Sequence, residues 1–212
     1  MEFRTWGGRR KGAGRKRVAP RPMVSHRARP RHREAHPVHV TLRACDGLPP
    51  FRERALFARM RECIRAASHD GFRVVQFSVQ RDHVHLIVEA RDPEGLSRGV
   101  QGLAIRLARG INRTLSVRGR VWGDRFHARE LRTPREVRNA LVYVLMNAKK
   151  HLRNAPDVDP FSSAPWFDGF AHLVALEMTA STPVVRAETW LARKGWRRRG
   201  RIAEREAPIA PG

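Results

Sequence analysis

The sequence predicts an α+β domain in which two helices cover one face of an antiparallel sheet. Apolar residues make up 41% of the 212 residues, which is enough for a hydrophobic core of ordinary domain size. These residues alternate in some stretches and recur every three or four positions in others, which predicts strands and helices respectively. The two patterns follow one another in the order strand, helix, strand, strand, helix, strand.

The first four elements lie before residue 91. Residues 36–44 alternate between apolar and polar side chains and predict a half-buried strand. Residues 51–69 carry apolar side chains at helical spacing, and Gly71 is expected to end this helix. Residues 72–90 then predict two strands joined by a short connection, which together form a hairpin.

The remaining elements complete the pattern. Residues 94–115 predict a second helix and residues 119–132 a fourth, irregular strand. Residues 133–152 predict one further helix, which begins with a capping box of Thr133 and Glu136. The first six elements follow the order of the ferredoxin-like βαββαβ fold. We expect both of its helices on one sheet face and the other face free for a ligand.

We divide the chain into three parts by composition. Residues 1–35 are basic and rich in Gly and Pro and predict a flexible arm. Residues 36–152 form the predicted domain. Residues 153–212 combine a Pro-rich linker, a short helix near 183–193 and a basic C-terminal tail.

The charge is strongly positive and concentrated at the two ends. The formal net charge is +23, and residues 1–33 hold 12 basic residues and one acidic residue. Residues 193–206 hold seven basic and two acidic residues. Such charge favours a nucleic acid as partner, because phosphate contacts release condensed counterions. The alternative is a solvated, arginine-rich surface without a partner.

The two cysteines and the lack of long apolar runs predict a cytoplasmic protein without a membrane partner. Cys45 and Cys63 have neither metal-type spacing nor the number needed for a disulfide framework. A reducing compartment fits this usage best. No apolar run approaches the roughly 20 residues that span a bilayer, and no signal peptide is recognisable.

The stretch QRDHVHLIVEA, residues 80–90, places two histidines on one strand face. His83 and His85 are two residues apart, so their backbones lie about 7 Å apart on the same side of the sheet. Two neutral imidazoles at this spacing can bind one divalent ion. The spacing alone favours the alternative, two exposed strand histidines that have no role.

Tyr143 is the single tyrosine of the chain. On a helical wheel it lies with Asn147 and Lys150, opposite the apolar stripe of its helix. A phenol must lose its proton to act as a nucleophile, and a nearby metal ion or Lys150 would favour that loss. Asn147, one turn later, is expected to offer an oxygen to an ion held by the histidines.

Three segments in order, HPVHVTLR, DHVHLIVEA and VYVLMNAKKH, resemble the single-tyrosine HUH transposases, most closely the REP-associated tyrosine transposases. The resemblance covers residues 36–152. It implies cleavage and rejoining of single-stranded DNA, flanked by a hairpin or repeat, through a 5′-phosphotyrosine on Tyr143. It also implies a Mg²⁺ or Mn²⁺ ion held by His83 and His85, with Asn147 as the further polar ligand.

Other residues receive auxiliary roles. Lys150 and His39 are expected beside the catalytic group, and Asp82 or Glu89 is considered as a further oxygen ligand. Four cationic residues are expected to contact the DNA backbone, with a solvated surface as the alternative: Arg43, Arg125, Arg129 and Lys149. His127 is expected to be structural or to contact phosphate.

Two other functions and two assembly states remain open. A domesticated, non-catalytic protein that binds DNA or RNA hairpins would need the basic surface but no nucleophile. A metal-dependent hydrolase would need the histidines but not Tyr143. The site could be completed within a monomer or across a homodimer.

Overall fold

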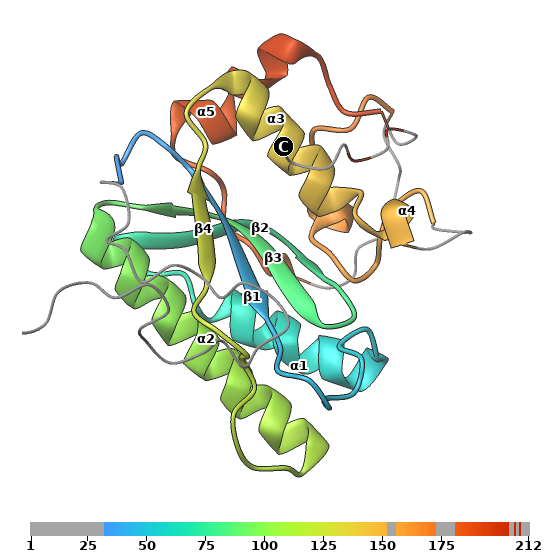
Figure 1. Cartoon of the computed structure of the whole chain (residues 1–212). Helices are drawn as coiled ribbons and strands as arrows, with labels where there is room; N and C mark the ends of the chain where they lie inside the picture. Colours follow the sequence, from blue (N-terminus) through green and yellow to red (C-terminus); the bar gives the residue numbers. More distant parts are fainter. Residues whose placement is uncertain (1–31, 152–155, 173–180, 204–205, 207, 209–212) are drawn as a thin grey trace, which may run out of the picture.

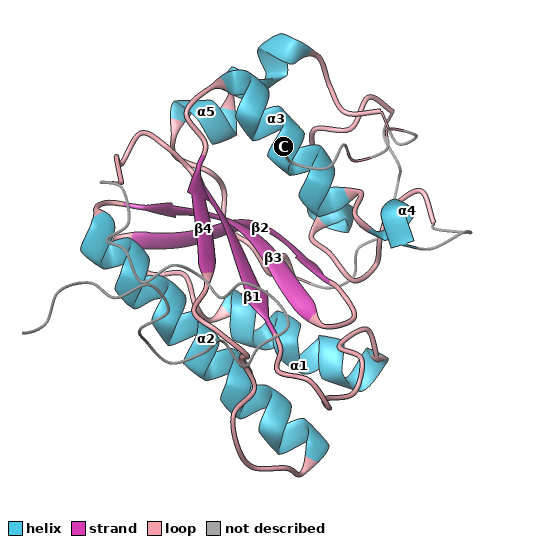
Figure 2. Ribbon diagram, in the orientation of Figure 1, coloured by secondary structure: helices cyan, strands magenta, loops and turns pink. Residues whose placement is uncertain are grey.

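A computed structural model describes residues 32–151, 156–172, 181–203, 206 and 208. The arm predicted for residues 1–35 therefore lies almost entirely outside the described residues. A four-stranded sheet with strand order β2-β3-β1-β4 forms the centre of the fold (Figures 1 and 2). Its strands are β1 (Val38–Arg43), β2 (Phe72–Val79), β3 (His83–Ala90) and β4 (His127–Glu130). All neighbouring pairs are antiparallel, as the ferredoxin-like pattern predicts.

Helices α1 (Arg54–Arg65) and α2 (Pro93–Leu115) cover one face of the sheet, as the sequence predicts. They share a buried core with the alternate residues of the strands, among them Val40 and Leu86. Gly99 lets α2 approach the sheet closely, because a Cβ atom at this position would clash with the Phe72 ring. In Figure 1 both helices lie on one side of the sheet, and α3 lies on the other.

The second face is not free, which corrects the sequence prediction. Helix α3 (Pro134–Leu145) packs on β2 and β3 and forms a second core with Val75 and Ile87. Val75 lies in this second core because it alternates with Val74, which belongs to the first. A register shift between Val74 and Gln76 then turns Phe77 and Val79 to the first core as well. Burial of these apolar side chains requires a cover, and α3 supplies it.

The predicted helix over residues 133–152 is broken in two. The capping box of Thr133 and Glu136 is confirmed at its start. The helix ends at Leu145, and a four-residue helix, α4 (Ala148–His151), follows. Asn147 therefore lies in the break, where it is fully buried rather than on the polar face that a continuous helix predicts.

The C-terminal segment packs along α3 and reaches the sheet beside it. Helix α5 (Trp190–Arg193) and the 3₁₀ helix η2 (Gly195–Arg199) contact α3. Trp196 is only 1% exposed, although it lies within a run of basic residues. The helix predicted near 183–193 is thus shorter and begins later. A third short element is the 3₁₀ helix η1 (Ala164–Trp166).

Glu89 anchors the start of α5 to the sheet. Its buried carboxylate accepts hydrogen bonds from the backbone N–H of Glu188 (2.8 Å) and from the N–H and hydroxyl of Thr189 (3.0 and 2.7 Å). Arg138 on α3 adds an ion pair to Glu206 (2.6 Å).

Among the described helices, none has the length and apolar character that crossing a bilayer requires.

Candidate functional site

The fold brings the predicted histidines and tyrosine together on the second face of the sheet. The ring centroid of Tyr143 on α3 lies 5.0 Å from that of His85 on β3, with the rings edge to face. The ring centroid of His39 on β1 lies 5.7 Å from that of Tyr143 and 5.2 Å from that of His85. His83 completes the group at 4.6 Å from His85. Three separate segments of one chain therefore converge on a single point.

Hydrogen bonds fix the orientation of His83 and His85. The Asp82 carboxylate accepts a hydrogen bond from Nδ1–H of His83 at 2.7 Å, which leaves Nε2 of that ring with its lone pair. Nδ1 of His85 is hydrogen-bonded with Oγ1 of Thr41 (3.1 Å) and lies 3.3 Å from Nε2 of His39. In each ring, Nε2 is thus the atom suited to a metal ion, with Nδ1 held by a neighbouring group.

Asp82 is held as a carboxylate by its two basic neighbours. Burial raises the pKa of Asp82, but the hydrogen bond from His83 and the positive charge of Arg43 outweigh this and lower the pKa overall. Arg43 forms an ion pair with Asp82 at 2.8 Å. Asp82 therefore supports the His83 ring, which differs from the direct ligand considered from the sequence.

Glu89 has no place in this group. It lies further along β3, and its carboxylate oxygens already accept hydrogen bonds from Glu188 and Thr189. The expectation that Glu89 offers an oxygen to the ion is therefore wrong. The sequence gives no sign that α5 would pack there.

Tyr143 lies in a partly buried setting beside an amide and an ammonium group. Burial raises the pKa of the Tyr143 phenol, and the nearby Asn147 amide opposes this only in part. The Nζ atom of Lys150 lies 5.8 Å from the centroid of the tyrosine ring. The three residues that the wheel places together do lie together, although the helix is interrupted between them.

The residues fit a divalent ion in chemistry. Asn147 is 0% exposed, and neither side-chain atom of its amide has a hydrogen bond of good geometry with the described residues. An unpaired buried amide is costly unless another group satisfies it. Within the described residues, no three His, Cys, Asp or Glu side chains converge as a complete ligand set. An ion here would need the amide oxygen or the substrate in addition to the imidazoles.

His39 is held neutral beside this group. Burial, together with the positive charges of His127 and Arg129, lowers the pKa of His39 from 6.5 to about 4. A neutral imidazole can accept or donate one hydrogen bond without adding charge. Thr41, which the sequence analysis did not single out, lies on the same face of β1 and contacts His85. Thr41 follows His39 by two residues on a strand and therefore shares its face, and this spacing is the signal that would have identified it.

The predicted DNA contacts divide into two groups. Arg129 and His127 on β4 lie opposite His39 and Thr41 in the strand register, so both extend the same sheet face. Arg129 and Arg125 are exposed, and Arg129 lies 3.8 Å from Glu136. Lys149 is different, because its side chain is only 16% exposed and lies 3.7 Å from Asp157.

Comparisons with known proteins identify the family of this chain. Residues 36–144, slightly more than half of the chain, match the family model described as "Transposase IS200 like". No curated protein matches the chain significantly. A solved structure of a REP-associated tyrosine transposase bound to a REP hairpin has the same fold, with a TM-score of 0.53 and 17% sequence identity. The match covers 66% of this chain and 82% of that chain. The resemblance read from the sequence is confirmed, and the chain belongs to the IS200-like transposase family.

Proposed function

We propose that this transposase cleaves and rejoins single-stranded DNA with Tyr143 as its nucleophile. The observation that carries the proposal is the edge-to-face contact of Tyr143 with His85, and with His39 beside it, in one chain. A nucleophile and a pair of oriented imidazoles then face the same phosphate. The similar solved structure is that of a transposase bound to a DNA hairpin, which supports a hairpin or repeat beside the cleaved strand.

In each step of the proposed exchange, one phosphorus–oxygen bond forms and one breaks. The Tyr143 oxygen loses its proton and attacks the scissile phosphorus, and the bond from phosphorus to the 3′ oxygen breaks. The products are a 5′-phosphotyrosine and a free 3′-hydroxyl. Attack by a 3′-hydroxyl on the phosphotyrosine reverses these changes, rejoins DNA and returns the phenol. The covalent link preserves the energy of the phosphodiester bond, so rejoining needs no external energy source.

The surrounding residues prepare this attack. Because burial raises the pKa of the phenol, a positive charge near the oxygen is needed to favour the phenolate. Lys150, whose Nζ atom lies 5.8 Å from the ring centroid, supplies such a charge, and it is exposed enough to meet a DNA phosphate as well. The neutral His39 adds a hydrogen-bonding group without repelling a cation.

His83, His85 and Asn147 are the residues that would hold a divalent ion. When bound, Mg²⁺ or Mn²⁺ would polarise a non-bridging oxygen of the scissile phosphate. Imidazoles are softer ligands than the carboxylates that Mg²⁺ prefers, so we expect Mn²⁺ to support cleavage at least as well. The hydrogen bonds of Asp82 and Thr41 keep the two rings in place for this role.

The test is the formation of a covalent protein–DNA adduct. The protein is incubated with Mn²⁺ and labelled single-stranded DNA that carries the hairpin repeat flanking its gene, and the products are separated on a denaturing gel. We expect an adduct that is lost in Tyr143→Phe, and the chain has no other tyrosine that could substitute. His83→Ala and His85→Ala should lose cleavage but retain DNA binding.

Other outcomes would identify a different function. DNA binding without any adduct would indicate a domesticated, non-catalytic hairpin-binding protein. Cleavage that survives Tyr143→Phe would indicate a metal-dependent hydrolase. Mixing Tyr143→Phe with His85→Ala distinguishes assembly states: restored cleavage would require a homodimer that combines residues of two chains, whereas a monomer that acts alone stays inactive.

A further inference from the structure

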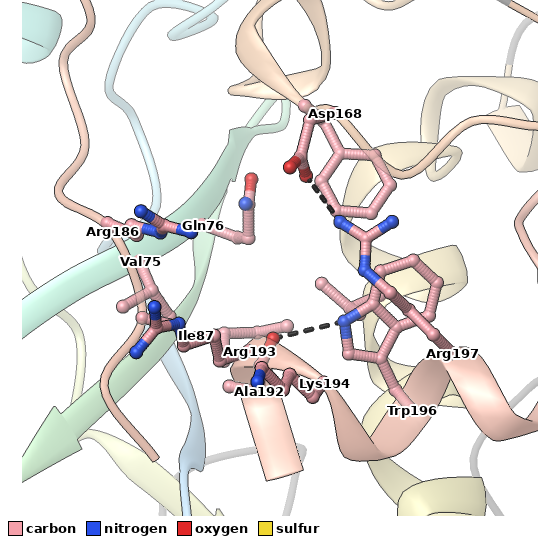
Figure 3. A pocket seen from close by; sticks show the side chains of 13 residues that line it. Val75, Gln76, Ile87, Asp168, Arg186, Ala192, Arg193, Lys194, Trp196 and Arg197 are labelled. Carbon is pink, nitrogen blue, oxygen red and sulfur yellow. Dashed lines mark hydrogen bonds and ion pairs between the residues drawn. The ribbon is translucent and has the colours of Figure 1, made fainter. Parts of the chain in front are cut away.

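A pocket of about 270 Å³ opens between β2, β3, α3 and the C-terminal segment (Figure 3). Its deeper part is apolar and includes the buried side chains of Val75, Ile87 and Leu141. Phe167 also lines it, and its partly exposed ring stacks on the buried ring of Trp196, with the centroids 5.6 Å apart. An apolar wall with one partly exposed aromatic ring suits a planar ligand.

The rim of the pocket is strongly cationic. Arg186, Arg193 and Lys194 are exposed, and none of the three side chains forms an ion pair with the described acidic residues. Arg197 is paired with Asp168 at 2.8 Å, and among the described residues Asp168 is the only acidic side chain that lines the pocket. In Figure 3, Arg186 lies on one side of the pocket and Arg197 on the opposite side. Like charges gathered around one small opening repel one another, and an anionic ligand would relieve this repulsion.

We infer that this pocket binds one unpaired deoxynucleotide of the DNA strand on which the enzyme acts. The base would lie against the apolar part, and the phosphate would meet the guanidinium groups at the rim. The NH₂ group of Gln76, whose oxygen accepts a hydrogen bond from Ser163 (2.6 Å), and the carboxylate of Asp168 can hydrogen-bond the polar edge of a base. The volume lies near the lower end for small-molecule pockets, which fits a single nucleotide rather than a longer segment.

The position of the pocket relative to the proposed catalytic group supports a strand ligand. Ile87 follows His85 by two residues on the same strand face, which is about 7 Å along the backbone. A strand whose phosphate lies at Tyr143 therefore has a neighbouring nucleotide within reach of the pocket. This inference rests on the proposed function, because it takes its ligand from that DNA substrate.

The first test compares arginines of the same segment. DNA binding is measured with the Tyr143→Phe protein and without divalent metal, so that cleavage plays no part. We expect Arg193→Gln and Arg186→Gln each to weaken binding about tenfold, since each removes a charge-assisted hydrogen bond. Arg199→Gln is the matched control, because Arg199 is an exposed arginine of η2 that does not line the pocket. Its effect should stay below about threefold.

The second test locates the nucleotide. Abasic sites are placed at each position of the oligonucleotide in turn, and one position near the cleavage site should lose about tenfold in affinity. In the Arg186→Gln/Arg193→Gln double variant, the same abasic site should cost less than about threefold, because the two contacts are coupled. Thermal unfolding confirms that each variant is folded, and Arg193→Lys should recover part of the binding.

Several results would overturn the inference. Equal losses for Arg193→Gln and Arg199→Gln would show that only the overall charge matters. A uniform abasic effect along the strand would show that no base enters a pocket. If deoxynucleoside monophosphate binds the pocket and the oligonucleotide does not displace it, the ligand is a free nucleotide and the assignment to the DNA strand is wrong. None of these results depends on adduct formation, so a failure of the proposed chemistry is detected separately.

Discussion

Replacement of Glu89 by Gln tests whether one buried carboxylate holds the C-terminal segment on the sheet. The substitution keeps the size of the side chain but removes its charge and turns one acceptor oxygen into a donor. The N–H of Glu188 would then face an NH₂ group, and the two bonds from Thr189 would become neutral. An unpaired buried donor costs about 1–3 kcal/mol, and a charged hydrogen bond exceeds a neutral one by about 1 kcal/mol.

Together these losses lower the free energy of unfolding by about 3 kcal/mol for Glu89→Gln. In a protein of this size the corresponding fall in Tm is about 6–12 °C. The assay is urea and thermal unfolding followed by circular dichroism. Glu62→Gln is the control, because Glu62 is an exposed carboxylate with one surface ion pair to Arg59, and we expect a change below about 0.5 kcal/mol.

A change of less than about 1 kcal/mol in Glu89→Gln, with the same unfolding slope as the wild type, would refute this reasoning. It would mean that the segment opens to water at little cost and that the three hydrogen bonds contribute almost nothing. Hydrogen exchange at the Thr189 amide provides a local measure, and this amide should exchange faster in Glu89→Gln than in Glu62→Gln.

Three further predictions concern the site and the fold. Asp82→Asn should lower the rate of adduct formation about 10–100-fold and raise the Mn²⁺ requirement with DNA binding unchanged, because it weakens the support of His83, which is proposed to bind the metal. An unchanged Mn²⁺ titration would contradict this role. Gly99→Ala should destabilise the protein by about 1–3 kcal/mol, because the new Cβ atom clashes with the Phe72 ring. A Cβ atom at Gly102 meets no other atom, so Gly102→Ala should stabilise the protein by up to about 1 kcal/mol. Similar shifts of the two variants in urea unfolding would argue against close packing of α2 on the sheet. Burial raises the pKa of Glu206, but hydrogen bonds from Arg138 and the Ala203 N–H hold it below its usual 4.5, so this stabilisation is present above pH 4.5 and is lost as the pH falls through the lower value. The stability difference between wild type and Arg138→Gln should therefore narrow below pH 4.5.

Strand faces and helix starts could be predicted from the sequence because both depend on neighbouring residues. Alternation placed His83 and His85 on one face of β3, opposite the apolar residues that pack under α1 and α2. The capping box of Thr133 and Glu136 is equally local, and its hydrogen bonds form as expected. The position of Tyr143 on its helix could also be predicted locally, because its angular separation from the apolar stripe follows from the helical period alone.

The features that the sequence did not predict depend on contacts between distant segments. The apolar pattern continues past Leu145, so the break before Asn147 has no local signal. Trp196 lies among basic residues and reads as part of a charged tail, yet it is buried against α3. The expected open face of the sheet was wrong for the same reason, because its cover is completed by residues more than 100 positions away from β2.

The position of Trp196 and Ile202 in the second core has a consequence for the order in which the protein matures on the ribosome. Helix α3 packs against a segment that is synthesised more than 50 residues after Tyr143. A nascent chain that ends before Trp196 already contains all the histidines and the tyrosine, but the side of α3 that this segment covers is still exposed to water. Tyr143, the proposed nucleophile, lies on α3, so we expect its contact with His85 to become stable only when translation has passed this segment. Competence to react with DNA is therefore expected to arise late in synthesis, as one of the last properties the chain acquires.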